Sequence, residues 1–162
     1  MFQRIYLSMD NRRFARHLIL DGFGETTQKK LAAARVLVIG AGGLGSALLS
    51  YLAAGGIGKL GIIDHDHVEL SNLHRQIVHE YGDIGRLKIE SAADRISELS
   101  PDCEVEVFAQ RLSAQNARAI VSRYDLVADG CDDFATRLVV NAACWAEAIP
   151  LVSASAIGYR GQ

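Results

Sequence analysis

A glycine-rich turn at residues 40–45 constrains the fold of this chain more than any other feature. The apolar run 36–39 breaks at Gly40 into the pattern G-x-G-x-x-G, formed by Gly40, Gly42 and Gly45, and a segment of small residues typical of a helix follows. This order predicts a strand, a tight turn and a helix. The first glycine permits the turn, the second lets a phosphate approach the backbone, and the third allows the helix to pack closely on the strand.

The turn predicts a nucleotide as the ligand. Free backbone N–H groups and the positive end of the helix dipole would face the same point, which suits an anion. Asp64 follows a second apolar run, 60–63, about 20 residues beyond the turn, where an acidic side chain can bind ribose hydroxyls. A glycine turn with a purely structural role is the alternative. The turn alone does not say which nucleotide would bind.

The composition is that of one soluble globular domain. The chain has 162 residues, which is enough for a single domain with a proper core. Its net charge of −2 gives no basis for binding nucleic acid or a membrane surface. No apolar run approaches the roughly 20 residues that span a bilayer, and residues 1–13 lack the apolar core of a signal sequence. We therefore expect a cytoplasmic protein.

Strand and helix patterns alternate along the chain. Strands are expected over residues 36–39, 60–63, 104–108, 126–128 and 151–154, and helices over 10–20, 28–34, 46–54, 86–99, 113–124 and 134–148. Expected helix caps are Thr26 or Thr27, Ser71 or Asn72, and Ser113. The alternation predicts an α/β, Rossmann-like fold with a doubly wound, mainly parallel sheet and helices on both faces. A helical extension, residues 1–34, precedes the nucleotide-binding domain of residues 35–162.

Charged residues after the expected strands favour ATP over NAD. Ligands of open α/β sheets bind beyond the carboxyl ends of the strands, where both Asp64 and the acidic run 129–133 fall. Arg75 and Lys88 are possible partners for a triphosphate, and Lys88 lies in a first helical turn, where the dipole disfavours a cation unless an anion lies nearby. Asp132 can serve as the hard oxygen ligand of Mg²⁺, which needs few carboxylates beside the phosphates.

Two other clusters are weaker candidates for chemistry. Residues 64–67, Asp-His-Asp-His, are rich in metal-ligand types, but an extended strand end sends neighbours to opposite faces, so all four are not expected to converge on a metal. Cys103, Cys131 and Cys144 are widely spaced and never form C-x-x-C, which excludes a zinc knuckle and a disulfide framework in this stretch. We interpret them as small buried hydrophobic residues.

Taken together, the motifs resemble the MoeB/ThiF/HesA family of adenylating enzymes, which activate ubiquitin-like sulfur-carrier proteins for molybdopterin and thiamine synthesis. The resemblance extends in order from about residue 10 to the C-terminus. The matching stretches are residues 16–23 (RHLILDGF), 40–45 (GAGGLG), 64–66 (DHD), 71–76 (SNLHRQ), 85–88 (GRLK) and 129–132 (DGCD).

This resemblance implies an adenylyltransferase that binds ATP and Mg²⁺. The C-terminal glycine carboxylate of the carrier would attack the α-phosphate, giving an acyl adenylate and pyrophosphate. By position, the nucleotide would meet Gly40, Gly42, Gly43, Gly45, Asp64, Ser71, Asn72, Arg75, Gln76, Lys88, Asp132 and Asp133. Arg75, Lys88 and Asp132 would be catalytic, with Asp132 as the metal ligand. Arg16 would reach the γ-phosphate in the site of a partner subunit, which implies a homodimer.

The chain departs from the family pattern in two respects. Asp133 stands where the family often has asparagine, which adds negative charge beside the metal site. The sequence ends at Gln162, whereas family members usually continue with more of the sheet and, in many, a paired C-x-x-C zinc site; we expect a truncated or unusually short member without that zinc site. The alternatives are an NAD-binding oxidoreductase domain and a non-catalytic dimerisation module of the same fold.

Overall fold

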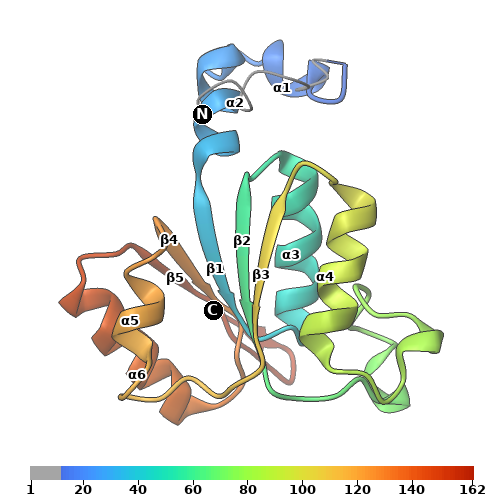
Figure 1. Ribbon diagram of the computed structural model, residues 1–162, viewed down its shortest axis with the longest axis vertical. Coiled ribbons are helices and arrows are strands. Elements are labelled where there is room, and N and C mark those ends of the chain that lie inside the picture. The colour runs from blue at the N-terminus through green and yellow to red at the C-terminus, as the bar shows by residue number, and fades with distance from the viewer. Residues whose placement is uncertain (1–11) are drawn as a thin grey trace.

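A five-stranded parallel sheet forms the centre of the molecule in the computed structural model, which describes residues 12–162. The strands follow the order β3-β2-β1-β4-β5 across the sheet. Their bounds are β1 Arg35–Ile39, β2 Lys59–Ile63, β3 Glu104–Phe108, β4 Leu126–Asp129 and β5 Leu151–Ser153. The chain starts in the middle with β1, extends outwards to β3, and returns to add β4 and β5 on the other side, which is a doubly wound topology (Figure 1).

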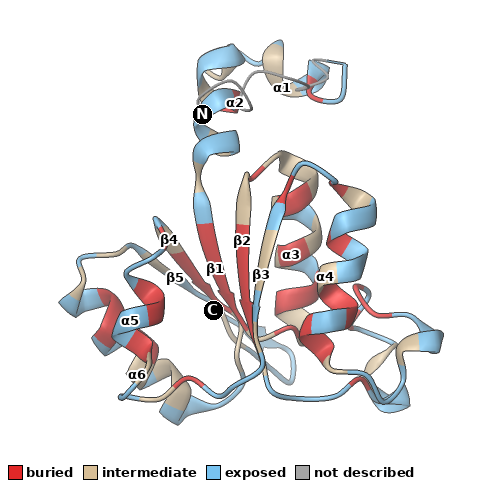
Figure 2. Ribbon diagram, viewed as in Figure 1, coloured by how far each residue is buried: buried red, intermediate tan, exposed pale blue. Residues whose placement is uncertain are grey.

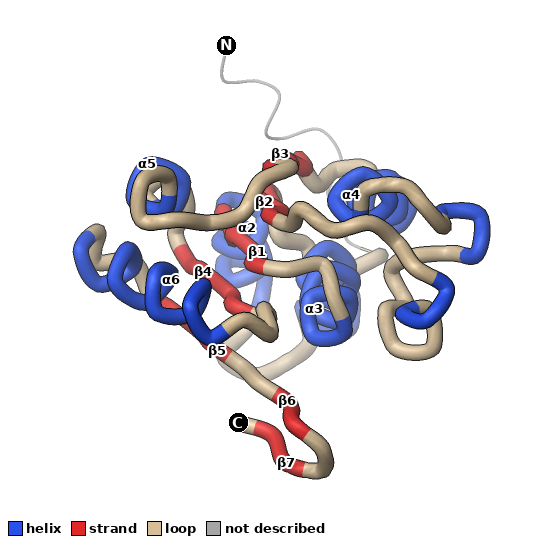
Figure 3. The backbone as a smooth tube through the Cα atoms, turned by 90° about the horizontal axis from the view of Figure 1, so that it is seen from below, coloured by secondary structure: helices blue, strands red, loops and turns tan. Residues whose placement is uncertain are grey.

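Helices cover both faces of the sheet. Figure 3, seen from the end where the strands finish, shows α3 (Gly43–Gly55) and α4 (Lys88–Leu99) on one side, with α5 (Ala117–Val121) and α6 (Phe134–Ala146) on the other. The central strands are therefore buried on both sides and read as continuous apolar runs (Figure 2). The fold class predicted from the sequence is confirmed.

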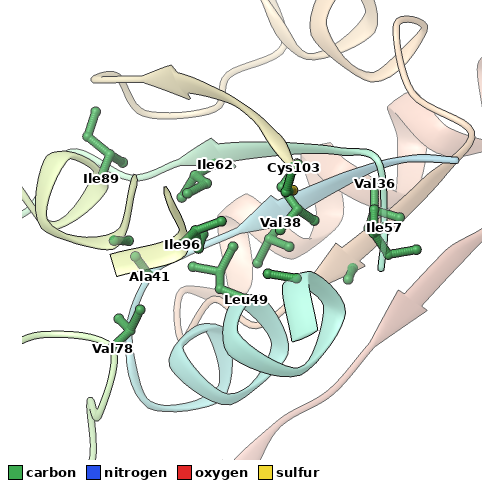
Figure 4. Close-up of a cluster of buried hydrophobic side chains, with 14 residues drawn as sticks. Val36, Val38, Ala41, Leu49, Ile57, Ile62, Val78, Ile89, Ile96 and Cys103 are labelled. Atoms are coloured by element: carbon green, nitrogen blue, oxygen red, sulfur yellow. The ribbon is translucent and has the colours of Figure 1, made fainter. Parts of the chain in front are cut away.

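Two apolar clusters fill the space between the sheet and its helices. One lies under α3 and α4 and includes Val38, Leu49, Ile62 and Ile96 (Figure 4). The other lies under α5 and α6 and includes the fully buried Tyr124. The third glycine of the turn belongs to this packing, since a Cβ on Gly45 would lie 1.9 Å from the carbonyl oxygen of Gly40.

From residue 12 onwards, two helices precede β1: α1 (Ala15–Leu18) and α2 (Gly24–Ala33). Figure 1 places them at the end of the sheet where the strands begin. Gln28 of α2 is fully buried, and its Nε2 donates to the Gly55 carbonyl over 3.0 Å while its Oε1 lies 2.8 Å from His17 Nδ1. The first bond attaches α2 to the C-terminal end of α3, and the second attaches it to α1.

Several expected boundaries are wrong. Residues 10 and 11 of the first expected helix lie outside the described residues, and the rest of it is helical only over α1. Helix α2 begins at Gly24, so Thr26 and Thr27 lie inside it instead of capping it. Ser71 and Asn72 lie within a single 3₁₀ turn, η1 (Leu70–Asn72), whose cap position is taken by Glu69, so neither of them caps a helix.

The later helices also differ at their ends. Helix α4 begins at Lys88, after an extended Leu87, two residues later than expected. Helix α5 covers only Ala117–Val121, since the Asn116 side chain bonds back to the Ser113 N–H over 2.8 Å and holds residues 113–116 as a turn. Helix α6 ends two residues early at Ala146.

Three short elements were not anticipated from the sequence. A 3₁₀ turn, η2 (Tyr81–Asp83), precedes α4, and a hairpin of β6 (Ala156–Ile157) and β7 (Arg160–Gly161) follows β5. Figure 3 shows the hairpin beyond β5, away from the five-stranded sheet. No helix among residues 12–162 is long and apolar enough to cross a bilayer.

Candidate functional site

The glycine turn adopts the geometry expected of a phosphate-binding loop. Gly40 has a φ of +87°, which a residue with a side chain rarely adopts, and its N–H donates to the Ile63 carbonyl over 2.9 Å. Helix α3 starts at Gly43, with Gly42 as a cap that has no side chain to satisfy the first N–H groups. The positive end of a 13-residue helix therefore faces the end of β1.

Asp64 connects this loop to the end of β2. Its Oδ2 accepts a hydrogen bond from the Ala41 N–H over 2.8 Å, and its Oδ1 accepts one from the Asp66 N–H over 2.8 Å. The carboxylate is thus fixed in place by two backbone donors, with lone pairs remaining on both oxygens. It lies beside the glycine loop, where the sequence predicted a ribose partner.

A cleft of about 830 Å³ opens beyond the carboxyl ends of the strands. It lies at the ends of the parallel neighbours β1 and β4, where the strand order reverses because β2 and β3 were added on one side of β1 and β4 and β5 on the other. Open α/β sheets bind ligands at this topological switch point. A smaller recess of about 400 Å³ adjoins it and shares Arg75, Gln76, Lys88 and Asp132 with it. A space of this size accommodates a nucleotide.

Most of the residues that the sequence singled out line these two spaces. Those in the main cleft are Gly40, Gly42, Gly43, Asp64, Arg75, Gln76, Lys88, Asp132 and Asp133. Asn72 lines the adjoining recess. Gly45 is buried beneath the loop, and Ser71 lies just outside, where its carbonyl accepts from Arg75 Nη1 over 3.3 Å. Arg16 lies in α1, at the opposite end of the sheet from the cleft (Figure 1).

Two cations flank the start of α3. Arg75 extends across it, because a Cβ on Gly43 would lie 3.7 Å from the Arg75 Cγ and Cδ atoms. Lys88 is only 6% exposed, and its Nζ lies 3.1 Å from Asp66 Oδ2. Partial burial works to raise the pKa of Asp66, but the hydrogen bond and charge of Lys88, with the nearby His65 and Arg111, outweigh it and hold that pKa below its usual range.

Gln76 adds an amide with unused hydrogen-bonding capacity. The residue is 4% exposed and lines both spaces, and its Nε2 would lie 3.8 Å from a Cβ on Gly42. Its Oε1 is buried and makes no hydrogen bond within residues 12–162. Buried polar groups are normally paired, so an unpaired amide beside the loop is consistent with a polar ligand.

The two aspartates after β4 have different surroundings. Among the described residues, the Asp132 carboxylate makes no hydrogen bond or ion pair, and it is exposed to the cleft. The Asp133 carboxylate caps α6, accepting from Thr136 Oγ1 over 2.6 Å and from Thr136 N–H over 3.0 Å. These bonds lower the pKa of Asp133. An asparagine at this position could make the same cap, so the departure from the family pattern preserves the local structure.

The acidic and histidine run after β2 is more clustered than the alternation argument predicted. Ligand atoms of Asp64, His65 and Asp66 lie within 4.8 Å of one another, while His67 is not part of the group. The chain leaves the extended conformation after Ile63 and turns, since the Asp66 N–H bonds back to Asp64. Three neighbouring side chains therefore converge here, which the alternation argument does not predict. The Asp66 carboxylate already forms an ion pair with Lys88.

The surroundings of all three cysteines disfavour the thiolate form. Cys103 and Cys144 are buried, and Cys131 is half-buried at the edge of the cleft. Burial raises the pKa of Cys103 to about 11 and, with the nearby Asp129 carboxylate, that of Cys131 to about 12. A thiol with such a pKa is not a nucleophile near neutral pH.

Sequence reasoning missed two side chains that shape the site. Arg137 of α6 donates to the carbonyls of Cys131 and Ala154, and so connects the segments that follow β4 and β5. His79 is buried against the glycine loop. The spacing of Arg137 four residues after Asp133, on the same face of a helix that begins at the cleft, is a signal that could have identified it.

Fold and cleft together define an α/β domain of the Rossmann type with a polar cleft at the carboxyl ends of its strands. The chain belongs to the ThiF family, whose model matches residues 14–162. The family resemblance found in the sequence motifs is therefore confirmed.

Curated relatives are named as adenylyltransferases. The adenylyltransferase and sulfurtransferase MOCS3-1 of Zea mays is 45% identical over 150 residues, covering 93% of this chain and 32% of that protein. The probable adenylyltransferase/sulfurtransferase MoeZ of Mycobacterium tuberculosis is 47% identical over 150 residues, covering 93% of this chain and 38% of that protein. A probable molybdopterin-synthase adenylyltransferase of Gracilaria tenuistipitata var. liui is 39% identical over 153 residues, covering 94% of this chain and 43% of that protein. The chain thus spans about a third to two fifths of their length.

Solved structures share the fold closely. The E. coli tRNA N6-threonylcarbamoyladenosine dehydratase, TcdA, solved in complex with ATP, matches with a TM-score of 0.83 and 33% identity, covering 88% of this chain and 58% of that one. E. coli MccB, solved with AMPCPP and MccA, matches with a TM-score of 0.79 and 25% identity, covering 93% of this chain and 45% of that one.

Proposed function

We propose that this chain is the nucleotide-binding part of an adenylyltransferase that uses MgATP to activate the C-terminal glycine of a ubiquitin-like sulfur-carrier protein. One observation supports this most strongly. The cleft combines the positive end of α3 with the side chains of Arg75 and Lys88 and with the unpaired carboxylate of Asp132. A triphosphate with its metal ion needs all of these groups, whereas a dinucleotide has no use for the last three.

Each side chain has a role in this proposal. The loop N–H groups at Gly42 and Gly43 contact phosphate oxygens, and the Asp64 carboxylate accepts from the ribose hydroxyls. The cations stabilise the triphosphate and the charge that develops on it, with Asn72, Gln76 and Ser71 as further polar neighbours. The catalytic set is Arg16, Arg75, Lys88 and Asp132.

The residues at the end of β4 fit a magnesium ion. Magnesium is usually held by one or two carboxylates together with phosphate oxygens and water, and the Asp132 carboxylate has no competing partner among residues 12–162. Asp133 is already engaged by Thr136, so Asp132 is the ligand we propose. The bound ion would neutralise charge on the triphosphate and on the leaving pyrophosphate.

The chemistry needs alignment more than proton transfer. A carboxylate oxygen of the carrier's C-terminal glycine bonds to the α-phosphorus, the bond from that phosphorus to the β-phosphate bridging oxygen breaks, and pyrophosphate leaves with its electron pair. Because the carboxylate is already ionised, no base is required, and the site contributes orientation and charge stabilisation. Thiols with raised pKa values at Cys103, Cys131 and Cys144 are unsuited to a further covalent step.

Relatives support both the reaction and the type of substrate. The names of the curated relatives include adenylyltransferase, sulfurtransferase and molybdopterin synthase, so a carrier of the molybdopterin-synthase type is favoured over that of thiamine synthesis. A structural relative was solved with ATP. That relative is named for a tRNA substrate, but the net charge of −2 gives this chain no electrostatic basis for binding tRNA, so we favour a protein partner.

The proposal includes a homodimer. Arg16 lies beyond the end of the sheet opposite the cleft, so it is poorly placed to reach the nucleotide of its own subunit and would act in the partner's site (Figure 1). Mixing Arg16→Ala and Asp132→Ala chains tests this, because mixed dimers would regain one intact site. Failure of mixing to restore activity in chains that do dimerise would argue against a shared site.

Calorimetry with MgATP and, in parallel, NAD tests the nucleotide assignment. We expect MgATP to bind and Asp132→Ala to weaken binding most when magnesium is limiting, while Asp102→Ala, an exposed aspartate outside the cleft, changes nothing. Carrier-dependent exchange of pyrophosphate into ATP then tests the reaction itself. Binding of NAD without ATP would overturn the proposal in favour of an oxidoreductase domain, and ATP binding without exchange would favour a non-catalytic module.

A further inference from the structure

His79 is buried directly behind the glycine loop. The residue is only 5% exposed, and its Nε2 lies 3.0 Å from the carbonyl oxygen of Ala41. A carbonyl oxygen can only accept a hydrogen bond, so the Nε2 atom carries the proton. The imidazole therefore donates to the loop from the side opposite the cleft.

This bond fixes the direction of a peptide group in the loop. The Ala41 carbonyl and the Gly42 N–H belong to one planar trans peptide, so they point in opposite directions. With the carbonyl held by His79 in the interior, the Gly42 N–H points away from the imidazole. Gly42 lines the cleft, and its N–H donates no hydrogen bond within the described part of the chain.

The peptide on the other side of Ala41 is fixed as well. The Ala41 N–H donates to Asp64 Oδ2 over 2.8 Å, and Ala41 itself is completely buried. Figure 4 shows Ala41 in the same apolar cluster as Val78 and Ile89, which keeps the chain around the imidazole packed against the loop. Of the two hydrogen bonds that hold this residue, only the one from His79 sets the direction of the Gly42 N–H.

His79 is in turn held by a polar chain that ends at the surface. Its Nδ1 lies 2.8 Å from Ser91 Oγ, and Ser91, only 1% exposed, lies 2.8 Å from Asp83 Oδ2. The Asp83 carboxylate also accepts from the Glu80 N–H over 2.9 Å and from Arg86 Nη1 over 2.7 Å. The imidazole is thus supported by α4 and η2, and its orientation is fixed before any ligand arrives.

We propose that His79 is a positioning residue for nucleotide binding: by holding the Ala41 carbonyl, it directs the Gly42 N–H towards the phosphates. The inference rests on the proposed function, because it requires phosphates at the glycine loop. His79 does not touch the nucleotide and acts through the loop peptide. A purely structural role for the same buried side chain would stabilise the fold without distinguishing phosphates from the rest of the ligand.

Two variants of similar size separate these roles. His79→Gln places an amide N–H near the position of Nε2 and keeps a donor for the Ala41 carbonyl. His79→Leu fills the space without a donor. We expect the leucine variant to bind MgATP about tenfold more weakly, the value of one hydrogen bond to a charged group, and the glutamine variant to bind within about threefold of wild type. Adenosine, which lacks phosphates, should bind all three chains within about twofold.

The experiment is calorimetry of MgATP and adenosine on the three chains, with the Gly42 amide followed by NMR. ATP should move the Gly42 amide proton downfield in wild type and His79→Gln but much less in His79→Leu. If His79→Leu does not fold, Ser91→Ala takes its place, because it removes the support at Nδ1. We expect this variant to lose MgATP affinity to an intermediate degree.

The outcomes distinguish this inference from the proposed function. Equal losses for adenosine and ATP in His79→Leu, or no loss for either, would overturn the positioning role while leaving the proposed function intact. If His79→Leu does not fold, unchanged ATP affinity in Ser91→Ala would have the same meaning. Absence of ATP binding by the wild-type chain would overturn the proposed function and, with it, this inference.

Discussion

Lys88 Nζ lies 3.1 Å from Asp66 Oδ2 at the edge of the cleft, so a buried cation of the candidate site is neutralised by a half-exposed carboxylate. The lysine side chain is 8% exposed and the aspartate side chain 53%. A triphosphate that binds Lys88 therefore competes with this carboxylate, which would also repel it. The pair holds the lysine side chain in place when no nucleotide is bound.

Replacing this carboxylate should strengthen nucleotide binding and weaken the free protein. For Asp66→Asn we expect MgATP to bind about threefold to tenfold more tightly, because a competing charge is removed, and the free energy of unfolding to fall by about 1 kcal/mol, because Lys88 loses its partner. Calorimetry and urea unfolding measure the two effects. Asp94→Asn removes an exposed ion pair with Arg86 and should change neither. Weaker ATP binding in Asp66→Asn would mean that the carboxylate orients Lys88 for the ligand instead of competing with it.

The two cations beside α3 should matter in the transition state. Arg75→Ala or Lys88→Ala should each slow carrier-dependent pyrophosphate exchange. The expected loss of transition-state stabilisation is roughly 3 kcal/mol, the value of one preorganised donor. Arg95→Ala provides the control, since Arg95 is an exposed arginine of α4 that does not line the cleft. Exchange at the wild-type rate in either cleft variant would remove that residue from the mechanism.

Fold class was predictable because it depends on local patterns that repeat. Apolar runs such as residues 36–39 and 60–63 are continuous because both faces of their strands are buried, and Gly40 and Asp64 mark where they end. Helix ends were less predictable. Residues 113–116 contain good caps, yet the Asn116 side chain bonds to the Ser113 N–H and delays the helix. Such competition between side chain and backbone is decided by a single contact that periodicity does not encode.

Within the site, residues in motifs were easier to find than the residues that support them. Asp64 and Lys88 follow strand and turn signals directly, and both line the cleft. His79 carries no such signal, because its partner Ala41 is 38 positions away and offers only a backbone carbonyl. Asp133 lines the cleft as the motif predicts, but the sequence does not reveal that its Oδ2 also caps α6. Contacts of this kind depend on tertiary structure.

Stability should fall in mild acid because of His79. Burial lowers the pKa of His79, and the charge of Lys88 lowers it further, which outweighs the raising effects of the Ala41 carbonyl and of Asp83 and Asp64. The unfolded chain therefore takes up this proton at a higher pH, about 6.5, than the folded chain does. This contribution to stability is complete above about pH 6.5 and is lost as the pH falls below it, by at most about 1.4 kcal/mol per pH unit.

Urea unfolding between pH 7.5 and 5.5 measures this effect. The free energy of unfolding of wild type should fall more steeply with acid than that of His79→Gln, which has no group titrating in this window at that position. Parallel curves for the two chains would show that the imidazole takes up its proton as readily in the folded protein as in the unfolded one.

Arg137 should be essential for the stability of the segments that follow β4 and β5. Its side chain is only 19% exposed, and it donates to Ser153 Oγ over 2.9 Å and to the Ala154 carbonyl over 2.7 Å. It also lies 3.6 Å from the carboxylate of Asp129, which is 1% exposed. Removing the arginine would leave the Asp129 carboxylate with hydrogen bonds but no counter-ion. Breaking a buried ion pair in this way typically lowers the free energy of unfolding by about 3–5 kcal/mol, and we expect about 3 kcal/mol at this partly exposed site.

Arg137→Met and Arg137→Lys separate charge from geometry. The methionine variant should lose about 3 kcal/mol of unfolding free energy, and the lysine variant should recover part of it, because a single ammonium keeps the charge but cannot reach all the acceptors at once. Since the same arginine donates to the Cys131 carbonyl, next to Asp132, both variants should also bind MgATP with a weaker dependence on magnesium. Full stability in Arg137→Met would mean that the hydrogen bonds from Ser153 and from the Cys131 N–H satisfy the Asp129 carboxylate without a counter-ion.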